Sequence, residues 1–164
     1  MRFLIFILLL TSCAYKQEKV NTVVHNARIY ACNNEFDIHQ AMAINDGKIV
    51  EIGPERQIMN KYRAEKFIDC QARYIYPIFI DQENQIQAFI NLLEELEDTD
   101  ADRKEALWML TLWKAREEYL EEETGSLVKG KYADFFISSA DLLSVDRKNL
   151  EAVKVIETYR KGKN

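Results

Sequence analysis

Glycine and proline are scarce in this sequence, with five and two residues among 164. Their scarcity excludes collagen-like and low-complexity architectures, in which these residues dominate. Three cysteines are too few for a disulfide scaffold, and a hydrophobic content of 48% is too high for a disordered chain. The composition is instead that of an ordinary globular domain.

Basic residues are outnumbered as well. Lys and Arg total 22 against 27 Asp and Glu, which gives a net charge of −5, and neither Lys nor Arg clusters along the chain. Because proteins bind phosphate backbones through basic surfaces, the sequence predicts no nucleic-acid partner. Acidic residues concentrate in residues 94–102 and 117–123, where a solvated helix face is favoured over a cation-binding or partner-binding patch.

The common catalytic motifs are missing. The sequence has no Gly-rich phosphate loop, Gly-x-Ser-x-Gly elbow or Cys-x-x-Cys pair. Its two histidines, His25 and His39, form neither a His-x-His nor a His-Glu-x-x-His pattern, so roles at the surface or in strand packing are favoured over a metal site. Nucleophilic catalysis has no visible base, because no histidine lies near Ser126, Ser138, Ser139 or Ser144.

The N-terminus has the pattern of a targeting segment. One arginine precedes eight consecutive apolar residues, 3–10, as in a secretory signal peptide. Residues 10–13 (LTSC) resemble a bacterial lipoprotein cleavage box, which predicts a signal peptide over 1–12, lipid on Cys13 and a tether over 13–20. Ala14 then favours the outer membrane, so we expect a lipid-anchored protein of the bacterial cell envelope. The alternative is a short hydrophobic start with an incidental cysteine.

The remaining length predicts one domain. Without the targeting segment about 150 residues are left, enough to bury roughly 70% of the unfolded surface. A (β/α)8 catalytic barrel takes roughly 250 residues and is therefore excluded.

The first half of the chain reads as strands. Residues 22–30 are rich in β-formers, and residues 41–44 and 48–52 flank Asp46 and Gly47, a strong hairpin signal because glycine accepts a positive φ. Pro54 suits the first turn of a short helix over 54–63. Residues 67–69 and 74–76 are predicted to be two further short strands.

In the second half of the chain, apolar residues recur at helical spacing. Apolar residues at 86, 89, 90 and 93 predict an amphipathic helix over 86–96, and a similar stripe predicts a second helix over 103–122 that begins with an Asp102–Glu105 capping box. Trp108 and Trp113 lie about 140° apart on an ideal α-helix, so separate core contacts are favoured over a shared ligand-stacking role. Residues 132–137 and 153–158 return to strand character.

Several blocks together resemble the metal-dependent amidohydrolases. Their beginning is matched by residues 25–30 (HNARIY), 41–53 (AMAINDGKIVEIG) and 76–81 (YPIFID). Their end is matched by residues 105–107, 111–113, 125–127 and 130–135 (GKYADF). The residues that carry these blocks, and to which we assign structural roles, are Asp46, Gly47, Pro77, Asp81, Gly130, Ala133 and Asp134.

The resemblance implies a fold that is mainly β with α. In that family both ends of the chain form a composite β-sandwich, and the catalytic barrel is inserted between them. Here the expected sandwich comprises residues 21–81 and 125–164, and residues 82–124 supply two or three helices where the barrel would stand. The resemblance also implies that Asp134 satisfies backbone donors at a corner of the sandwich.

The resemblance further implies chemistry that this chain lacks. The family activates water on divalent metal, typically zinc, to cleave carbon–nitrogen bonds other than peptide bonds. Its first two ligands are histidines placed two and four residues after the aspartate at position 81, and here those positions hold Glu83 and Gln85. Asp81 and Glu83 are thus the only candidate metal ligands. We expect no catalytic residue and no cofactor in this chain.

Three functions remain open. The leading hypothesis is an inactive, membrane-anchored protein that retains the non-catalytic domain of an amidohydrolase. The alternative is an interaction module of the cell envelope, and the third is a residual metal hydrolase completed by histidines across a dimer. The apolar face of the second helix packs on the other helix, on the sandwich or on a second subunit, so a homodimer through an exposed helix face or sheet edge is a hypothesis. Cys32 and Cys70 are either two buried thiols or a disulfide.

Overall fold

The computed structural model describes residues 16–78 and 80–164. The expected signal peptide and Cys13, the expected lipidation site, lie outside the described residues. Within the described ranges, no helix has the length and apolar character needed to cross a bilayer.

The chain alternates a β-rich half, a helical segment and a short β-rich end. The elements run in the order β1 (Glu18–Tyr30), β2 (Ile38–His39), β3 (Ala41–Asn45), β4 (Lys48–Gly53), α1 (Glu55–Lys61), β5 (Tyr62–Pro77), α2 (Gln85–Glu94), α3 (Asp100–Trp108), a π-helix (Met109–Trp113), α4 (Lys114–Glu117), β6 (Phe135–Ser138), a 3-10 helix (Arg147–Ala152) and β7 (Val155–Tyr159).

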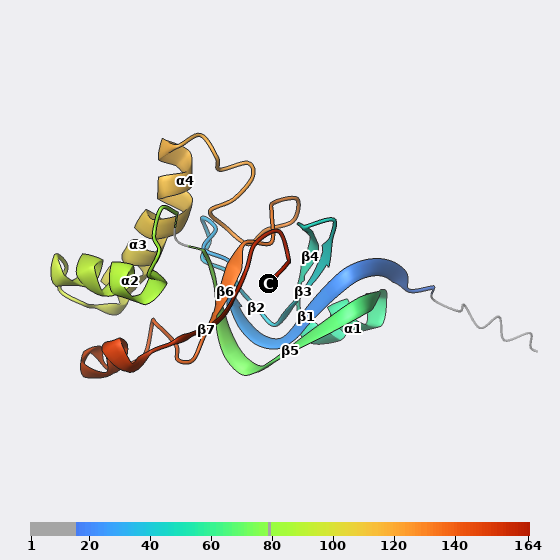
Figure 1. The fold of residues 1–164 in the computed structure, drawn as a ribbon, viewed down its shortest axis with the longest axis horizontal. Helices are drawn as coiled ribbons and strands as arrows, with labels where there is room; N and C mark the ends of the chain where they lie inside the picture. Colours follow the sequence, from blue (N-terminus) through green and yellow to red (C-terminus); the bar gives the residue numbers. More distant parts are fainter. Residues whose placement is uncertain (1–15, 79) are drawn as a thin grey trace, which may run out of the picture.

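All strands join one mixed sheet in the order β4-β3-β1-β5-β6-β7, with β2 paired to β1. β1 and β5 are parallel neighbours, and the other pairs are antiparallel. The sheet curls into a half-barrel, with α1 beside the start of β5 and α2 to α4 gathered at the other end of the molecule (Figure 1). The expected fold class, mainly β with helices and without a catalytic barrel in the described residues, is confirmed.

The long parallel pair differs from the predicted strands. β5 is one strand of 16 residues rather than two short ones, and β1 starts at Glu18, inside the segment predicted to be a tether. A bulge bridges the two predicted pieces, where Gln71 and Ala72 adopt positive φ. Asp69 Oδ1 accepts the Gln71 N–H at 2.8 Å, so the side chain replaces a ladder bond lost at the bulge.

The predicted helices are present with shifted ends. The capping box that starts α3 is formed by Thr99 and Asp102 rather than by Asp102 and Glu105. α4 ends at Glu117 rather than at 122, and Tyr119 follows in a left-handed conformation with φ 59°.

A π-helical turn changes how the two tryptophans lie. A π-helix spaces its hydrogen bonds at i→i+5, so residues five apart come to lie near one another on the same side of the helix. Trp108 and Trp113 therefore stack, with ring centroids 6.0 Å apart and planes 16° apart. Trp108 Nε1 also donates to the carbonyl of Asn33 at 2.9 Å. The predicted separation of about 140° is wrong because the segment is not an α-helix.

Three groups of buried side chains form the core. One lies between the helical segment and the sheet and includes Phe89, Leu107 and Phe136. A second fills the curl of the sheet around Ile75 and Phe135, and a third is covered by α1 through Ile58. Cys32 and Cys70 belong to different groups and are free, buried thiols.

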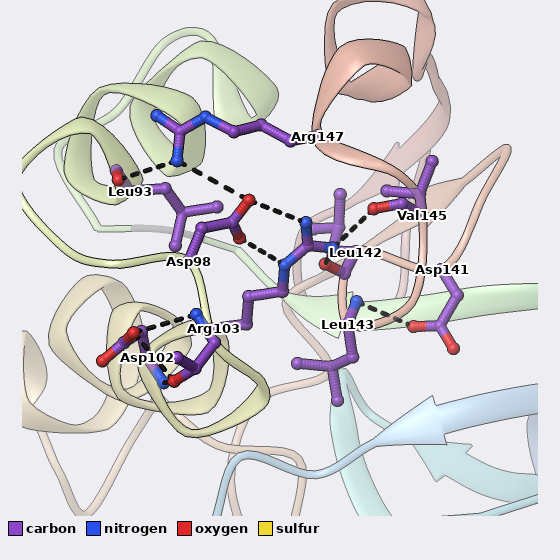
Figure 2. A network of polar contacts seen from close by, with 10 residues as sticks. Leu93, Asp98, Asp102, Arg103, Asp141, Leu142, Leu143, Val145 and Arg147 are labelled. Atoms are coloured by element: carbon purple, nitrogen blue, oxygen red, sulfur yellow. Dashed lines mark hydrogen bonds and ion pairs between the residues drawn. The ribbon is translucent and has the colours of Figure 1, made fainter.

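A buried polar network ties the helices to the segment after β6 (Figure 2). Arg103 Nε and Nη2 donate to the Asp98 carboxylate at 2.5 and 3.1 Å. Arg103 Nη1 donates to the carbonyls of Leu142 and Val145 at 3.0 and 2.6 Å. Arg147 approaches the same carboxylate at 3.6 Å from the opposite side. One guanidinium thus links the start of α3 to residues 142–145.

Candidate functional site

Four of the motif residues singled out in the sequence, Gly47, Gly130, Ala133 and Asp134, meet at one corner of the sheet. Gly47 adopts φ +78°, and its carbonyl accepts the N–H of Ala133 at 2.9 Å. The Gly130 N–H binds the carbonyl of Ile49 at 2.8 Å, which holds the segment along the edge of β4. Asp134 Oδ1 accepts the backbone N–H of Lys161 at 2.6 Å. Backbone hydrogen bonds therefore fasten the β3–β4 hairpin to residues 130–133, and the Asp134 side chain holds the turn at Lys161.

A cleft opens beside this corner, where the chain leaves β5. Its volume is about 1070 Å³, and its walls come from the loop after β5, α2, the end of α4 and β7. The polar residues that line it are Asp81, Gln82, Glu83, Asn84, Gln85, Gln87, Glu118, Thr124, Asp134, Glu151, Thr158 and Arg160. Its volume exceeds those of the clefts beside Arg147, Glu55 and Lys16, and it contains the sequence-predicted ligands.

Backbone hydrogen bonds fix the loop that carries Asp81. The Ile78 N–H binds the Asp134 carbonyl and the Ile80 N–H binds the Leu110 carbonyl, both at 3.1 Å. Asp81 itself has φ +57°, a left-handed conformation that aspartate tolerates better than most residues. The aspartate is therefore held between the sheet and the π-helical turn.

Asp81 and Glu118 interact in this cleft. Hydrogen bonding to Glu118 and the negative charge of that carboxylate raise the pKa of Asp81. Lys114 Nζ lies 2.9 Å from Glu118 Oε1, and its hydrogen bond lowers the pKa of Glu118. Sequence reasoning missed Glu118 and Lys114, although their i, i+4 spacing on a helix was a signal for the ion pair.

The remaining predicted positions do not form a metal centre. Glu83 is exposed, and Gln85 Nε2 donates to the carbonyl of Gln82 at 2.6 Å. His25 lies in β1 with its ring 6.2 Å from that of Phe67, and His39 lies in β2, where burial lowers its pKa. Among the described residues, no three His, Cys, Asp or Glu side chains are grouped so as to hold a metal ion. The donor set does not fit zinc, which prefers several nitrogen or sulfur ligands.

Comparison with known proteins points to one family. Residues 87–164 match the amidohydrolase family model, a region that starts inside α2 and runs through β7. The chain is also 33% identical over 73 residues to an adenine deaminase of Bacillus subtilis (strain 168). The chain is therefore related to the amidohydrolase family over part of its length.

Two solved structures are similar over parts of the chain. An adenosine deaminase from Xanthomonas campestris, solved with bound zinc, has 13% identity and a TM-score of 0.36 over 39% of this chain. An amidohydrolase from Thermotoga maritima MSB8 has 16% identity and a TM-score of 0.36 over 64% of this chain. This chain spans 11% of the length of the adenine deaminase, and 15% and 23% of the two crystallised chains.

Proposed function

We propose that this chain is a non-catalytic domain related to the amidohydrolases, attached to a membrane through lipid on Cys13. The observation that supports the non-catalytic assignment is the composition of the cleft. The two positions at which the family resemblance implies histidines hold Glu83 and Gln85. Gln85 is already hydrogen-bonded to the backbone of its own loop, and neither histidine lines the cleft.

The carboxylates of the cleft give no substitute for a zinc site. Asp81 interacts with Glu118, which pairs with Lys114, so these two carboxyl groups are engaged by internal contacts. Carboxylates alone favour Mg²⁺ or Ca²⁺ over zinc, and those ions require more oxygen ligands than the pair supplies. Water activation by metal therefore has no basis among the described residues.

Metal content tests the non-catalytic half of the proposal. The full chain is dialysed against zinc and then against metal-free buffer, and metal per chain is measured together with hydrolysis of amide and cyclic-imide substrates. We expect neither retained metal nor turnover. About one metal per chain, with activity that is lost in Glu83→Ala and kept in a matched Glu95→Ala variant, would establish a residual hydrolase instead.

The anchoring half rests on the sequence pattern that ends at Cys13. Expression in a bacterial host should yield a membrane-bound product whose mass includes acyl chains on Cys13, and Cys13→Ser should release it into the soluble fraction. An unmodified cysteine on the wild-type product would refute anchoring by this route.

An interaction module is the second candidate, and the helical segment favours it. Large apolar side chains are exposed there on Met109, Trp113, Tyr119 and Leu120, and Tyr119 is 91% exposed. Such a surface suits a homodimer. Light scattering should give a dimer mass that falls to the monomer value in Trp113→Glu, and a monomeric wild-type protein at tens of micromolar would exclude this contact.

A further inference from the structure

A basic groove lies at the end of the domain that is nearest to Cys13 in the sequence. The groove has a volume of about 660 Å³ and is lined by Lys16, Gln17, Lys19, Asn60 and Arg63. Three of these five residues are cations, and none is acidic. The concentration of positive charge contrasts with the net charge of −5 of the whole chain.

Tertiary contacts bring these cations together. Lys19 on β1 is directly opposite Arg63 on β5 in the parallel register, although they are far apart in sequence. Gln17 Nε2 donates to the carbonyls of Met59 and Asn60 at the end of α1, both at 3.2 Å. This pair of hydrogen bonds holds the start of the described chain against the domain and keeps Lys16 beside the groove.

The three cations are available to a partner. All three side chains, Lys16, Lys19 and Arg63, are exposed. Within the described residues, none of them takes part in an ion pair. The acidic neighbours along the strands, Glu18 and Glu65, do not line the groove, and Glu18 lies 3.9 Å from Lys61. The positive potential of the groove is therefore not neutralised internally.

The position of the groove indicates what it would meet. Lys16 is three residues after Cys13, and the start of β1, the start of β5 and α1 form one end of the molecule, away from α2 to α4 (Figure 1). If Cys13 carries lipid, a chain of three residues cannot carry this end far from the bilayer surface. Clusters of Lys and Arg next to a membrane attachment point bind anionic headgroups.

We propose that the groove formed by Lys16, Lys19 and Arg63 binds anionic phospholipid headgroups and orients the domain on the membrane. The groove end then faces the bilayer, and the cleft containing Asp81 and the exposed helix surface face away from it. This inference rests on the proposed membrane attachment, but it adds a separate electrostatic contact that does not require the acyl chains.

The test uses the full chain with Cys13→Ser, so that no variant carries lipid. Sedimentation with vesicles of phosphatidylcholine alone, or of phosphatidylcholine mixed with phosphatidylglycerol, gives a ratio of the two partition coefficients. The apolar N-terminal residues are common to all variants, so their contribution cancels from comparisons of this ratio. The groove variant is Lys16→Gln/Lys19→Gln/Arg63→Gln, and the matched control is Lys129→Gln/Lys148→Gln/Lys154→Gln, which removes the same charge from exposed positions elsewhere.

We expect the unsubstituted groove to favour anionic vesicles, and high salt to weaken the preference by screening. Each basic side chain near an anionic surface contributes roughly fivefold in affinity, so the groove variant should lower the ratio by roughly tenfold or more. The single variant Lys19→Gln should lower it by roughly fivefold, and the control should change it by less than about twofold. Equal ratios for the groove variant and the control would overturn the proposal. So would the absence of a preference for anionic vesicles in the protein with the unsubstituted groove. Because no variant carries lipid, neither result depends on whether Cys13 is acylated.

Discussion

Replacing Arg103 with methionine would remove the centre of the polar network in Figure 2. The Arg103 side chain is 7% exposed and donates to the Asp98 carboxylate and to the carbonyls of Leu142 and Val145. Methionine preserves most of the apolar stem but supplies no donor. The substitution therefore leaves the largely buried Asp98 carboxylate, the buried Leu142 carbonyl and the partly buried Val145 carbonyl without their main partner.

These contacts set bounds on the expected decrease in the free energy of unfolding. Removing one partner of a buried ion pair costs about 3–5 kcal/mol. Arg147 remains 3.6 Å from Asp98, so we expect the lower end, about 3 kcal/mol in the free energy of unfolding. Arg147→Met is the matched control, because it removes the same charge from the same carboxylate. The Arg147 side chain is 49% exposed, and its removal should cost less than about 1 kcal/mol.

Urea unfolding at several pH values provides the assay. Hydrogen bonding from Arg103 lowers the pKa of Asp98 from its ordinary value of 3.8. The stabilisation is therefore present above the pKa of the unfolded chain and is lost as the pH falls through the lower pKa of the folded state. The difference between wild type and Arg103→Met should shrink in acid. A loss below about 1 kcal/mol at neutral pH, or a loss equal to that of Arg147→Met, would refute the role given to Arg103.

Three further predictions concern stability and reactivity. Glu51→Gln should lower the free energy of unfolding by about 1 kcal/mol at neutral pH. Lysine and tyrosine partners lower the pKa of Glu51 from 4.5 to about 2, so in thermal unfolding this loss should vanish as the pH falls from 4.5 towards 2. Gly125→Ala should lower the free energy of unfolding in urea by about 2 kcal/mol, because Gly125 has φ +79° and an added Cβ would lie 2.5 Å from the side chain of Ala115. Unchanged stability would contradict this packing. Burial raises the pKa of Cys32 and Cys70 to about 12, so in Cys13→Ser neither thiol should react with a thiol reagent before unfolding, and rapid native labelling would show that they are accessible.

Local patterns in the sequence were sufficient for the elements that depend on local forces. The hairpin at Asp46 and Gly47 follows from the positive φ that both residues adopt, and α2 follows from its apolar stripe. The candidate site was predictable only in part. Asp81 and Glu83 were identified by their place in a motif, whereas Glu118 reaches the same cleft from a distant helix.

The sequence by itself determined the fold class, the positions of most elements and the absence of a histidine pair after Asp81, because these follow from composition, periodicity and local order. The tertiary structure decided the rest. It joined two predicted strands into β5 across a bulge, turned the middle of a predicted helix into a π-helix, and placed Lys19 beside Arg63. These features depend on pairing and packing between residues distant in sequence, and no periodic pattern along one segment encodes such contacts.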